Sequence, residues 1–162
     1  MLYQQFTYLD TDWWLLGTAG QIYALDNDPN CLAPWRDQGM SEDHLGILDP
    51  VVTAIQKDHY VISDLADWSL VLDRGTPFQE KVWRALLDIP WGETCSYQGL
   101  AQKIGNSQAS RAVANAVGRN PIMLLVPCHR VIAKDGSLGG FRGGIQVKSC
   151  LLAREQEIKN SK

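Results

Sequence analysis

The chain has 162 residues, of which 45% are hydrophobic and 20% charged, as is typical of a globular protein. This length suits one domain of ordinary size or two small domains that share an interface. No apolar run approaches the roughly 20 residues of a membrane-spanning helix, and the first residues lack the basic and apolar segments of a secretory signal. We therefore expect no membrane association and a cytoplasmic location.

The net charge of −3 conceals an uneven distribution along the chain. Residues 1–74 hold 12 acidic and 3 basic side chains, a balance of −9, whereas residues 75–162 hold 6 and 12, a balance of +6. We divide the chain accordingly into an N-terminal α/β domain, 1–74, and a C-terminal domain, 75–162. The basic half could bind a polyanion, although a folded dipole without a ligand would show the same asymmetry.

In the N-terminal half, residues 12–25 form two β-rich runs around a turn that contains glycine, which predicts a hairpin. Residues 41–57 are expected to be helical, with the helix started or broken at Pro50. A short strand is expected over 60–63, followed by a connector that reaches Arg74.

The C-terminal half opens with a helix signal: Thr76 as the cap, Pro77 at the first helical position and Gln79 three residues after the cap. A short helix over 96–104, a Gly-Asn turn and a second helix capped by Ser107 then predict a helix-turn-helix. The second helix is rich in alanine, which permits close approach to a groove but would equally serve packing against neighbouring helices.

The apolar run 122–126 predicts a strand buried on both faces and ended by Pro127. Cys128 and His129 follow directly. Because neighbouring side chains of a strand point to opposite faces, His129 can serve Cys128 only if the chain turns there, and Pro127 favours such a turn.

A thiol reacts as its thiolate, and an unperturbed thiol with a pKa of about 8.5 is only slightly ionised at neutral pH. A neighbouring imidazole can take the proton, and a carboxylate can hold the imidazole in place. Glu155, on a helix expected from Val147 onward, is the candidate carboxylate. From the spacing alone, a buried cysteine beside a surface histidine is the favoured interpretation, because adjacent Cys and His residues are common by chance.

The remaining cysteines form no C-x-x-C pair and no disulfide-type pattern, so free thiols are expected. Cys95 and Cys150 are interpreted as packing residues. Cys31, His44 and His59 make no recognisable zinc pattern, His44 and His59 being expected at the surface. No metal and no cofactor are expected.

An ordered set of short motifs runs from about Gly75 to Glu155. It comprises Thr76-Pro77-Phe78-Gln79, Val82-Trp83, Ile89-Pro90, Gly92, Ser96-Tyr97, Arg111-Ala112-Val113, Asn120-Pro121, Pro127-Cys128-His129-Arg130-Val131, Gly143-Gly144, Leu151-Leu152 and Glu155. This set resembles the O6-alkylguanine-DNA alkyltransferases, also called methylated-DNA–protein-cysteine methyltransferases. The N-terminal half is similar to that family only through the hairpin near residues 17–25.

The resemblance implies an α/β (α+β) fold. It has a small N-terminal sheet with helices, and a C-terminal helical domain with the helix-turn-helix and the Pro-Cys-His-Arg segment. It also implies that Cys128 attacks the alkyl carbon, that His129 takes the thiol proton through a water, and that Glu155 orients His129. Tyr97 would protonate guanine at N3, and Asn120 would brace the turn between the recognition helix and the active site.

For the DNA, the resemblance implies that Arg111 enters the base stack from the minor groove and fills the space of a flipped-out nucleotide. Other DNA-binding residues are expected on the same surface: Ala109, Ala112, Ser96 and Arg119. The expected partner is double-stranded DNA with O6-alkylguanine, bound with weak sequence preference and strong salt dependence. No obligate protein partner is expected, and the chain is expected to be a monomer.

The substrate pocket implied by the resemblance contains Val131, Met123, Phe141 and Arg142. Met123 stands where the family often has a smaller residue, and Phe141 replaces a frequent tyrosine. Arg142 precedes Gly143-Gly144 in a mixed pattern. Methyl is therefore the expected alkyl group, transferred once and irreversibly, because no second nucleophile is placed to remove it.

Three other functions remain open at the level of sequence. The chain could be a module that binds the lesion without repairing it, although family relatives of that kind lack the cysteine. It could be a Cys-His hydrolase without a DNA role, which would turn over repeatedly. It could also be a transcription factor with an inert cysteine, which would bind DNA with high sequence specificity.

Overall fold

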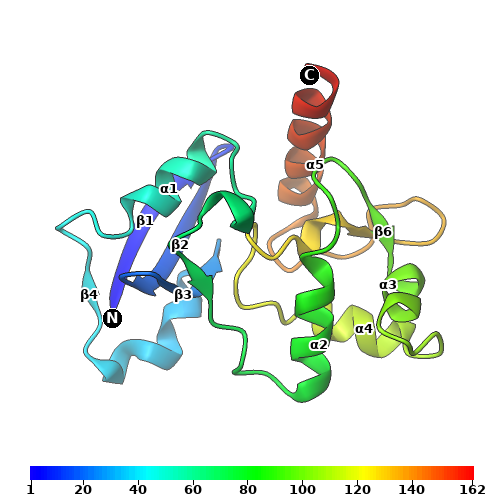
Figure 1. Cartoon of the computed structure of the whole chain (residues 1–162), viewed down its shortest axis with the longest axis horizontal. Helices are drawn as coiled ribbons and strands as arrows, with labels where there is room; N and C mark the ends of the chain where they lie inside the picture. Colours follow the sequence, from blue (N-terminus) through cyan, green and yellow to red (C-terminus); the bar gives the residue numbers. More distant parts are fainter. The chain divides into compact units, whose positions relative to one another are not determined.

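The computed structural model describes all 162 residues, which form two compact units (Figure 1). One unit contains Met1–Val71 together with Pro121–Leu125, and the other contains Leu72–Asn120 together with Val126–Lys162. The mixed α and β content agrees with the predicted fold class. The division of the chain into domains at 74/75 stays a prediction, and the contacts additionally assign the short segment Pro121–Leu125 to the first unit.

The first unit is built on a five-stranded sheet in the order β4-β1-β2-β3-β5. Its strands are β1 Leu2–Tyr8, β2 Thr11–Thr18, β3 Gln21–Asp26, β4 Ser41–Glu42 and β5 Ser69–Leu70. The three long strands are antiparallel neighbours, and the two short ones pair parallel to them at the edges. The predicted hairpin is confirmed as β2 and β3, joined at Gly20, whose φ of 82° suits glycine.

Both faces of this sheet are covered. Leu16 packs on one face with Ala24, Leu32 and Trp35, the last two from the 3₁₀ helix η1 Pro29–Gln38. Gly17 points to the opposite face, where a Cβ atom would lie 2.9 Å from the Leu48 side chain that precedes helix α1 Asp49–Gln56. The pairing of β2 with β3 shifts register between Leu16 and Gly17, and the lack of a side chain at Gly17 leaves room for Leu48.

Two predictions for this unit are wrong in extent or type. The helix expected over 41–57 is limited to α1, because the Asp43 carboxylate accepts hydrogen bonds from the N–H groups of Leu45 (3.2 Å) and Leu48 (2.6 Å) and stabilises a turn before it. The strand expected at 60–63 is a single 3₁₀ turn, η2 Ile62–Asp64.

The strand predicted over 122–126 is also wrong. Only one isolated bridge, Leu25 to Ile122, has strand geometry. Leu124 has a φ of 67°, and the N–H of Leu125 donates to the carbonyl of Met123 at 2.8 Å, so the run forms a tight buried turn. A short apolar run signals burial, and its periodicity does not separate a strand from other buried structure.

The second unit contains four helices, a short 3₁₀ turn and a two-stranded parallel sheet. Their bounds are α2 Pro77–Leu86, β6 Cys95–Ser96, α3 Tyr97–Lys103, α4 Ser110–Val117, η3 Cys128–Arg130, β7 Val131–Ile132 and α5 Ile145–Asn160. No helix of the whole chain is both long and apolar enough to traverse a bilayer.

The predicted capping box of α2 is confirmed: Thr76 Oγ1 accepts from the Gln79 N–H at 3.2 Å, and the Gln79 side chain accepts from the Thr76 N–H at 2.9 Å. The helix-turn-helix is confirmed as α3 and α4, with Ser96 capping α3. The Ser107 cap is wrong, since α4 begins at Ser110 after a turn in which the Ala109 N–H donates to the Asn106 carbonyl.

Candidate active site

Cys128 lies at the first position of η3, immediately after Pro127, and is only 4% exposed. The chain leaves extended geometry at Pro127, whose ψ is 63°, and the Arg130 N–H donates to the Pro127 carbonyl at 3.1 Å. The turn that the sequence required between Cys128 and His129 is therefore present. It removes the opposite-face arrangement that a continued strand would impose.

His129 is fully buried, with Nε2 lying 2.7 Å from Glu155 Oε1. Burial lowers the pKa of His129 below its usual range, since it outweighs the opposing effect of Glu155, and the positive charges of Arg130 and Lys148 lower it further. The ring is therefore neutral at neutral pH. Because Glu155 accepts at Nε2, that nitrogen carries the proton and Nδ1 is the basic atom.

Glu155 projects from the middle of α5 and is fully buried. Its carboxylate accepts from His129, from Arg130 and from the N–H of Gly92 at 3.0 Å. Burial alone would raise the pKa of Glu155, but the hydrogen bonds and charges of His129 and Arg130 lower it to about 2. Glu155 is consequently an anion over the whole physiological pH range.

Arg130 completes this cluster, and the sequence analysis gave it no role. Its Nε lies 3.1 and 3.0 Å from the two oxygens of Glu155, Nη2 lies 3.0 Å from Oε1, and Nη1 donates to the Ile89 carbonyl at 2.7 Å. The guanidinium carbon sits 5.3 Å from the ring centre of Trp91. The sequence could have indicated Arg130, because a carboxylate expected to be buried, such as Glu155, needs a cationic partner and Arg130 directly follows His129.

Tyr97 is the first residue of α3 and is half-buried. Burial, followed by the charge of Cys128, raises the pKa of Tyr97 above its ordinary value. Its phenol therefore stays protonated at neutral pH and can donate a proton or a hydrogen bond. A Cβ atom at Gly139, whose φ is 66°, would lie 3.5 Å from the Tyr97 ring. The loop between β7 and α5, which contains Gly139, therefore approaches this ring closely.

Lys148 is a second buried cation that the sequence analysis missed. Its ammonium donates to the carbonyls of Val131, Leu138 and Gly140, at 2.6 Å for Val131, and lies 5.9 Å from the Phe141 ring centre. Burial lowers the pKa of Lys148, while the charge of Cys128 opposes this. The contacts join the loop that contains Phe141 to β7 and to α5.

Asn120 is 1% exposed and links two segments of the second unit. Its side-chain amide donates to the Val126 carbonyl at 2.8 Å, and its own carbonyl accepts from Arg142 Nη2 at 2.8 Å. Asn120 thus bridges the end of the α4 region and the segment that leads into Cys128. Met123 belongs to the first unit, where its N–H donates to the Leu25 carbonyl at 2.7 Å.

The helix α4 separates apolar from exposed positions. Val113, Ala116 and Val117 are buried, and the Trp83 indole donates to the Ala116 carbonyl at 2.8 Å, so part of the alanine content does serve packing. Arg111 and Ala112 are exposed, with Ala109 half-exposed before them. Arg119 is also exposed and donates to Asn115 at 3.0 Å.

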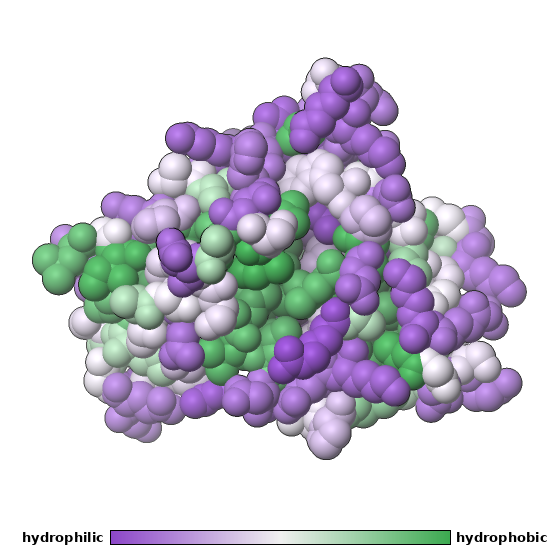
Figure 2. Space-filling view, viewed as in Figure 1, coloured by the Kyte–Doolittle hydropathy of each residue, from purple (hydrophilic) through white to green (hydrophobic).

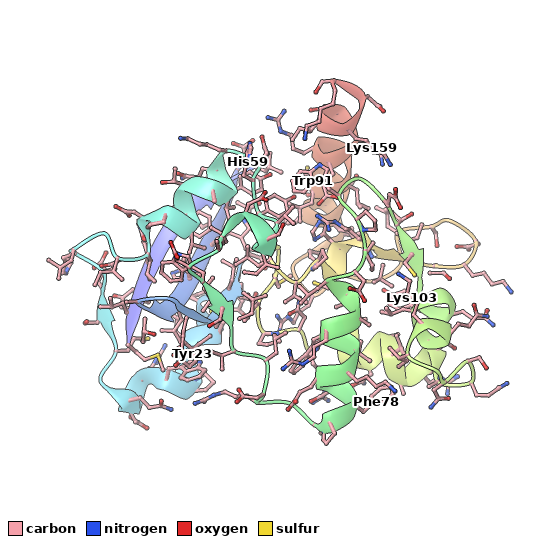
Figure 3. All side chains as sticks on the ribbon, viewed as in Figure 1. Tyr23, His59, Phe78, Trp91, Lys103 and Lys159 are labelled. Atoms are coloured by element: carbon pink, nitrogen blue, oxygen red, sulfur yellow. The ribbon has the colours of Figure 1, made fainter.

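An open pocket of about 580 Å³ lies between α4 and the N-terminal end of α2, where Figure 3 labels Phe78. Its lining includes Phe78, Gln108, Arg111 and Asn115. Lys103, at the end of α3, is a further exposed cation of the helix-turn-helix (Figure 3).

The other cysteines and histidines lie apart from these contacts. All four cysteines are free thiols. Cys95 is half-buried in β6, whereas Cys150 is exposed, which corrects its interpretation as a packing residue. His44 and His59 are exposed, as expected. No group of three or more His, Cys, Asp or Glu side chains is placed to hold a metal ion.

The fold and the site together define a helix-turn-helix protein in which a buried cysteine adjoins a buried His-Glu-Arg cluster. Residues 77–157 match the family described as "6-O-methylguanine DNA methyltransferase, DNA binding domain". The methylated-DNA–protein-cysteine methyltransferase of Mycobacterium tuberculosis is 50% identical over 102 residues, 62% of this chain and 62% of that protein. The match therefore spans less than two thirds of the length of this curated relative.

Solved structures extend the similarity to nearly the whole chain. The O6-methylguanine methyltransferase of M. tuberculosis has a TM-score of 0.78 and 36% identity, covering 96% of this chain and 92% of the other. M. tuberculosis OGT in complex with DNA has a TM-score of 0.74 and 32% identity, covering 97% and 94%. The chain belongs to the 6-O-methylguanine DNA methyltransferase family, and the resemblance stated from its sequence is confirmed.

Proposed function

We propose that this protein repairs O6-alkylguanine, chiefly O6-methylguanine, in double-stranded DNA by transferring the alkyl group irreversibly to Cys128. The observation that carries the proposal is the buried contact of 2.7 Å between His129 and Glu155, directly after Cys128 in a helix-turn-helix unit. The named activity of the M. tuberculosis relative and the DNA-bound structure of M. tuberculosis OGT support it.

In the reaction, the sulfur of Cys128 forms a bond to the alkyl carbon while the bond from that carbon to guanine O6 breaks. The thiol proton passes, through a water, to Nδ1 of His129, and Glu155 stabilises the resulting imidazolium. Tyr97 donates a proton to guanine N3, which makes the purine a better leaving group, and the imidazolium proton returns through solvent to the phenolate. The products are a thioether on Cys128 and an unmodified guanine.

The DNA surface of the proposal is the exposed side of α4. The target atom is inaccessible inside a duplex, so the nucleotide must be flipped out at a cost of a few kcal/mol. Arg111 is long enough to occupy the vacated space, and the small neighbours Ala109 and Ala112 allow α4 to enter a minor groove. Ser96 and Arg119, on flanking parts of the same unit, are proposed to contact the DNA backbone.

We assign the alkyl pocket to Val131, Phe141 and Arg142, with Asn120 bracing the segment that precedes Cys128. The hydrogen bond from Arg142 Nη2 to the Asn120 carbonyl supports placing Arg142 beside the segment that Asn120 braces. A cytoplasmic location fits the four free thiols, which persist in a reducing compartment.

Intact-protein mass spectrometry tests the proposal. The protein is incubated with a duplex that contains one O6-methylguanine, and Cys128→Ala serves as the control. We expect the mass of one methyl group on the wild type, mapped to Cys128 and absent from the variant. Tight lesion binding without any mass change would instead indicate a module that only marks damage, and repeated turnover of an ester would indicate a hydrolase.

A further inference from the structure

The Glu155 carboxylate has more donors than an orienting partner of His129 would need. His129 contacts Oε1 alone, while Arg130 reaches both oxygens and the Gly92 N–H reaches Oε2. Two carboxylate oxygens offer about four acceptor positions, and these four contacts, with a fifth from Arg130 Nη2 to Oε1, fill them. The guanidinium takes the largest share.

Arg130 is itself held from three sides, so its place at Glu155 is fixed. Nη1 donates to the Ile89 carbonyl, the guanidinium lies over Trp91, and the side chain is 5% exposed. Figure 3 labels Trp91 close to α5, the helix that carries Glu155. Gly92, next to Trp91, has a φ of 69° and accepts from the side chain of Gln156, which keeps this loop against α5.

One negative and two positive side chains surround His129 and together determine how readily it is protonated. Glu155 supplies one negative charge, which Arg130 neutralises at contact distance, and Lys148 on α5 adds a further positive charge that disfavours protonation of His129. From other elements, Cys128 and Tyr97 adjoin the site, and Gly92 adds the positive end of a peptide dipole to Glu155. Without Arg130, the buried Glu155 carboxylate would keep only His129 and the Gly92 N–H as donors, and no full positive charge to balance it.

We propose that Arg130 is a positioning residue for the alkyl transfer, which keeps Glu155 as an anion already compensated by charge and thereby keeps His129 a neutral base. This inference rests on the proposed function. In a His-Glu pair alone, the carboxylate would both orient the imidazole and favour its protonation. With Arg130 balancing its charge, Glu155 can orient His129 without making it an imidazolium before Cys128 is deprotonated.

The test is the pH dependence of the single-turnover rate of methyl transfer between pH 5 and pH 9. The wild-type rate should decline only below about pH 6.5, the ordinary pKa of histidine. In Arg130→Gln the pKa of His129 should rise, so the decline should begin roughly one pH unit or more higher. Arg130→Lys retains the positive charge, so its rate should decline at the same pH as that of the wild type. The rate itself should be lower at every pH, because lysine cannot contact both oxygens of Glu155 as arginine does.

Arg154→Gln provides the matched control, because Arg154 lies on α5 in a surface pair with Glu157 and should leave the pH profile unchanged. Because stability itself falls below pH 6.5, the folded fraction of Arg130→Gln is measured at each pH and the rate is divided by it. The proposal requires this corrected profile to move. A profile of Arg130→Gln that coincides with the wild type overturns the proposal.

A second measurement needs no variant. Nitrogen NMR of the three histidines should show His129 neutral at pH 7 with its proton on Nε2, and an imidazolium at that pH would contradict the inference. Failure of the proposed function would appear differently, as a wild type that acquires no methyl group at any pH.

Discussion

At the scale of single residues, Glu155 is the most constrained side chain of the second unit. Its two oxygens serve donors from η3 and from the loop after α2, although Glu155 itself lies on α5. A fully buried anion is tolerated only when its hydrogen-bonding positions are occupied and its charge is balanced. Glu155 therefore ties three separate chain segments together in addition to orienting His129.

We expect Glu155→Gln to destabilise the protein by about 3–5 kcal/mol, because it breaks a buried ion pair and leaves Arg130 uncompensated. Urea denaturation, followed by a signal from the second unit, measures the change. Glu157→Gln is the matched control two positions along α5, where an exposed pair should contribute less than about 1 kcal/mol. Equal losses in the two variants would show that the cluster adds no specific stability.

At the scale of elements, α4 combines one face that packs with another that is open to solvent. The bond from Trp83 to the Ala116 carbonyl and the buried Val113 fix α4 against α2 and α3. This attachment leaves Arg111 exposed at the edge of the open pocket. The helix can therefore present a long cation without loss of its own packing.

We predict that Arg111→Ala weakens binding to a duplex with one O6-methylguanine by roughly 10- to 100-fold, since replacing a stacked base is worth about 1–3 kcal/mol. Fluorescence anisotropy at several salt concentrations measures the affinity and its salt slope. Arg154→Ala, a cation of α5 away from α4, should bind like the wild type. An Arg111→Ala affinity equal to that of the wild type would argue against insertion of this side chain.

At the scale of the whole molecule, ionic side chains lie in the interior as well as on the surface. Hydrophilic side chains cover the C-terminal turns of α5 in Figure 2, while the same helix contributes the buried Lys148 and Glu155. Such a helix has no purely apolar stripe in its sequence, because ionic side chains occupy part of its inner face. Stability thus depends on the protonation state of buried groups as well as on apolar packing.

We expect the free energy of unfolding to fall as the pH is lowered from 6.5. Below that pH the unfolded chain protonates His129, whereas the folded protein, in which the pKa of His129 is lowered, does not. Between pH 4.5 and about 2, protonation of Glu155 in the unfolded state removes about 3 kcal/mol more. Urea denaturation at pH 7.5, 5.5, 4 and 3 measures both losses, and a stability independent of pH between 7.5 and 3 would contradict the prediction.

Local signals in the sequence were sufficient where the physical cause is local. The capping box at Thr76, the hairpin around Gly20 and the two helices of the helix-turn-helix all depend on residues a few positions apart. The extent of α1 and the start of α4 were not predictable in this way. Asp43 and the turn before Ala109 compete with helix formation through side-chain and backbone bonds that propensity does not measure.

By itself, the sequence determined the family, the mixed α/β class and the neighbourhood of Cys128 and His129, because ordered motifs and short-range patterns encode them. Only the tertiary structure decided that the run 122–126 is a buried turn, that Arg130 reaches both oxygens of Glu155, and that Lys148 is enclosed by three carbonyls. The contacts of Arg130 with Glu155 and of Lys148 with the carbonyls join residues 8 to 25 positions apart, and hydrogen bonding and charge compensation in a buried site depend on distance in space.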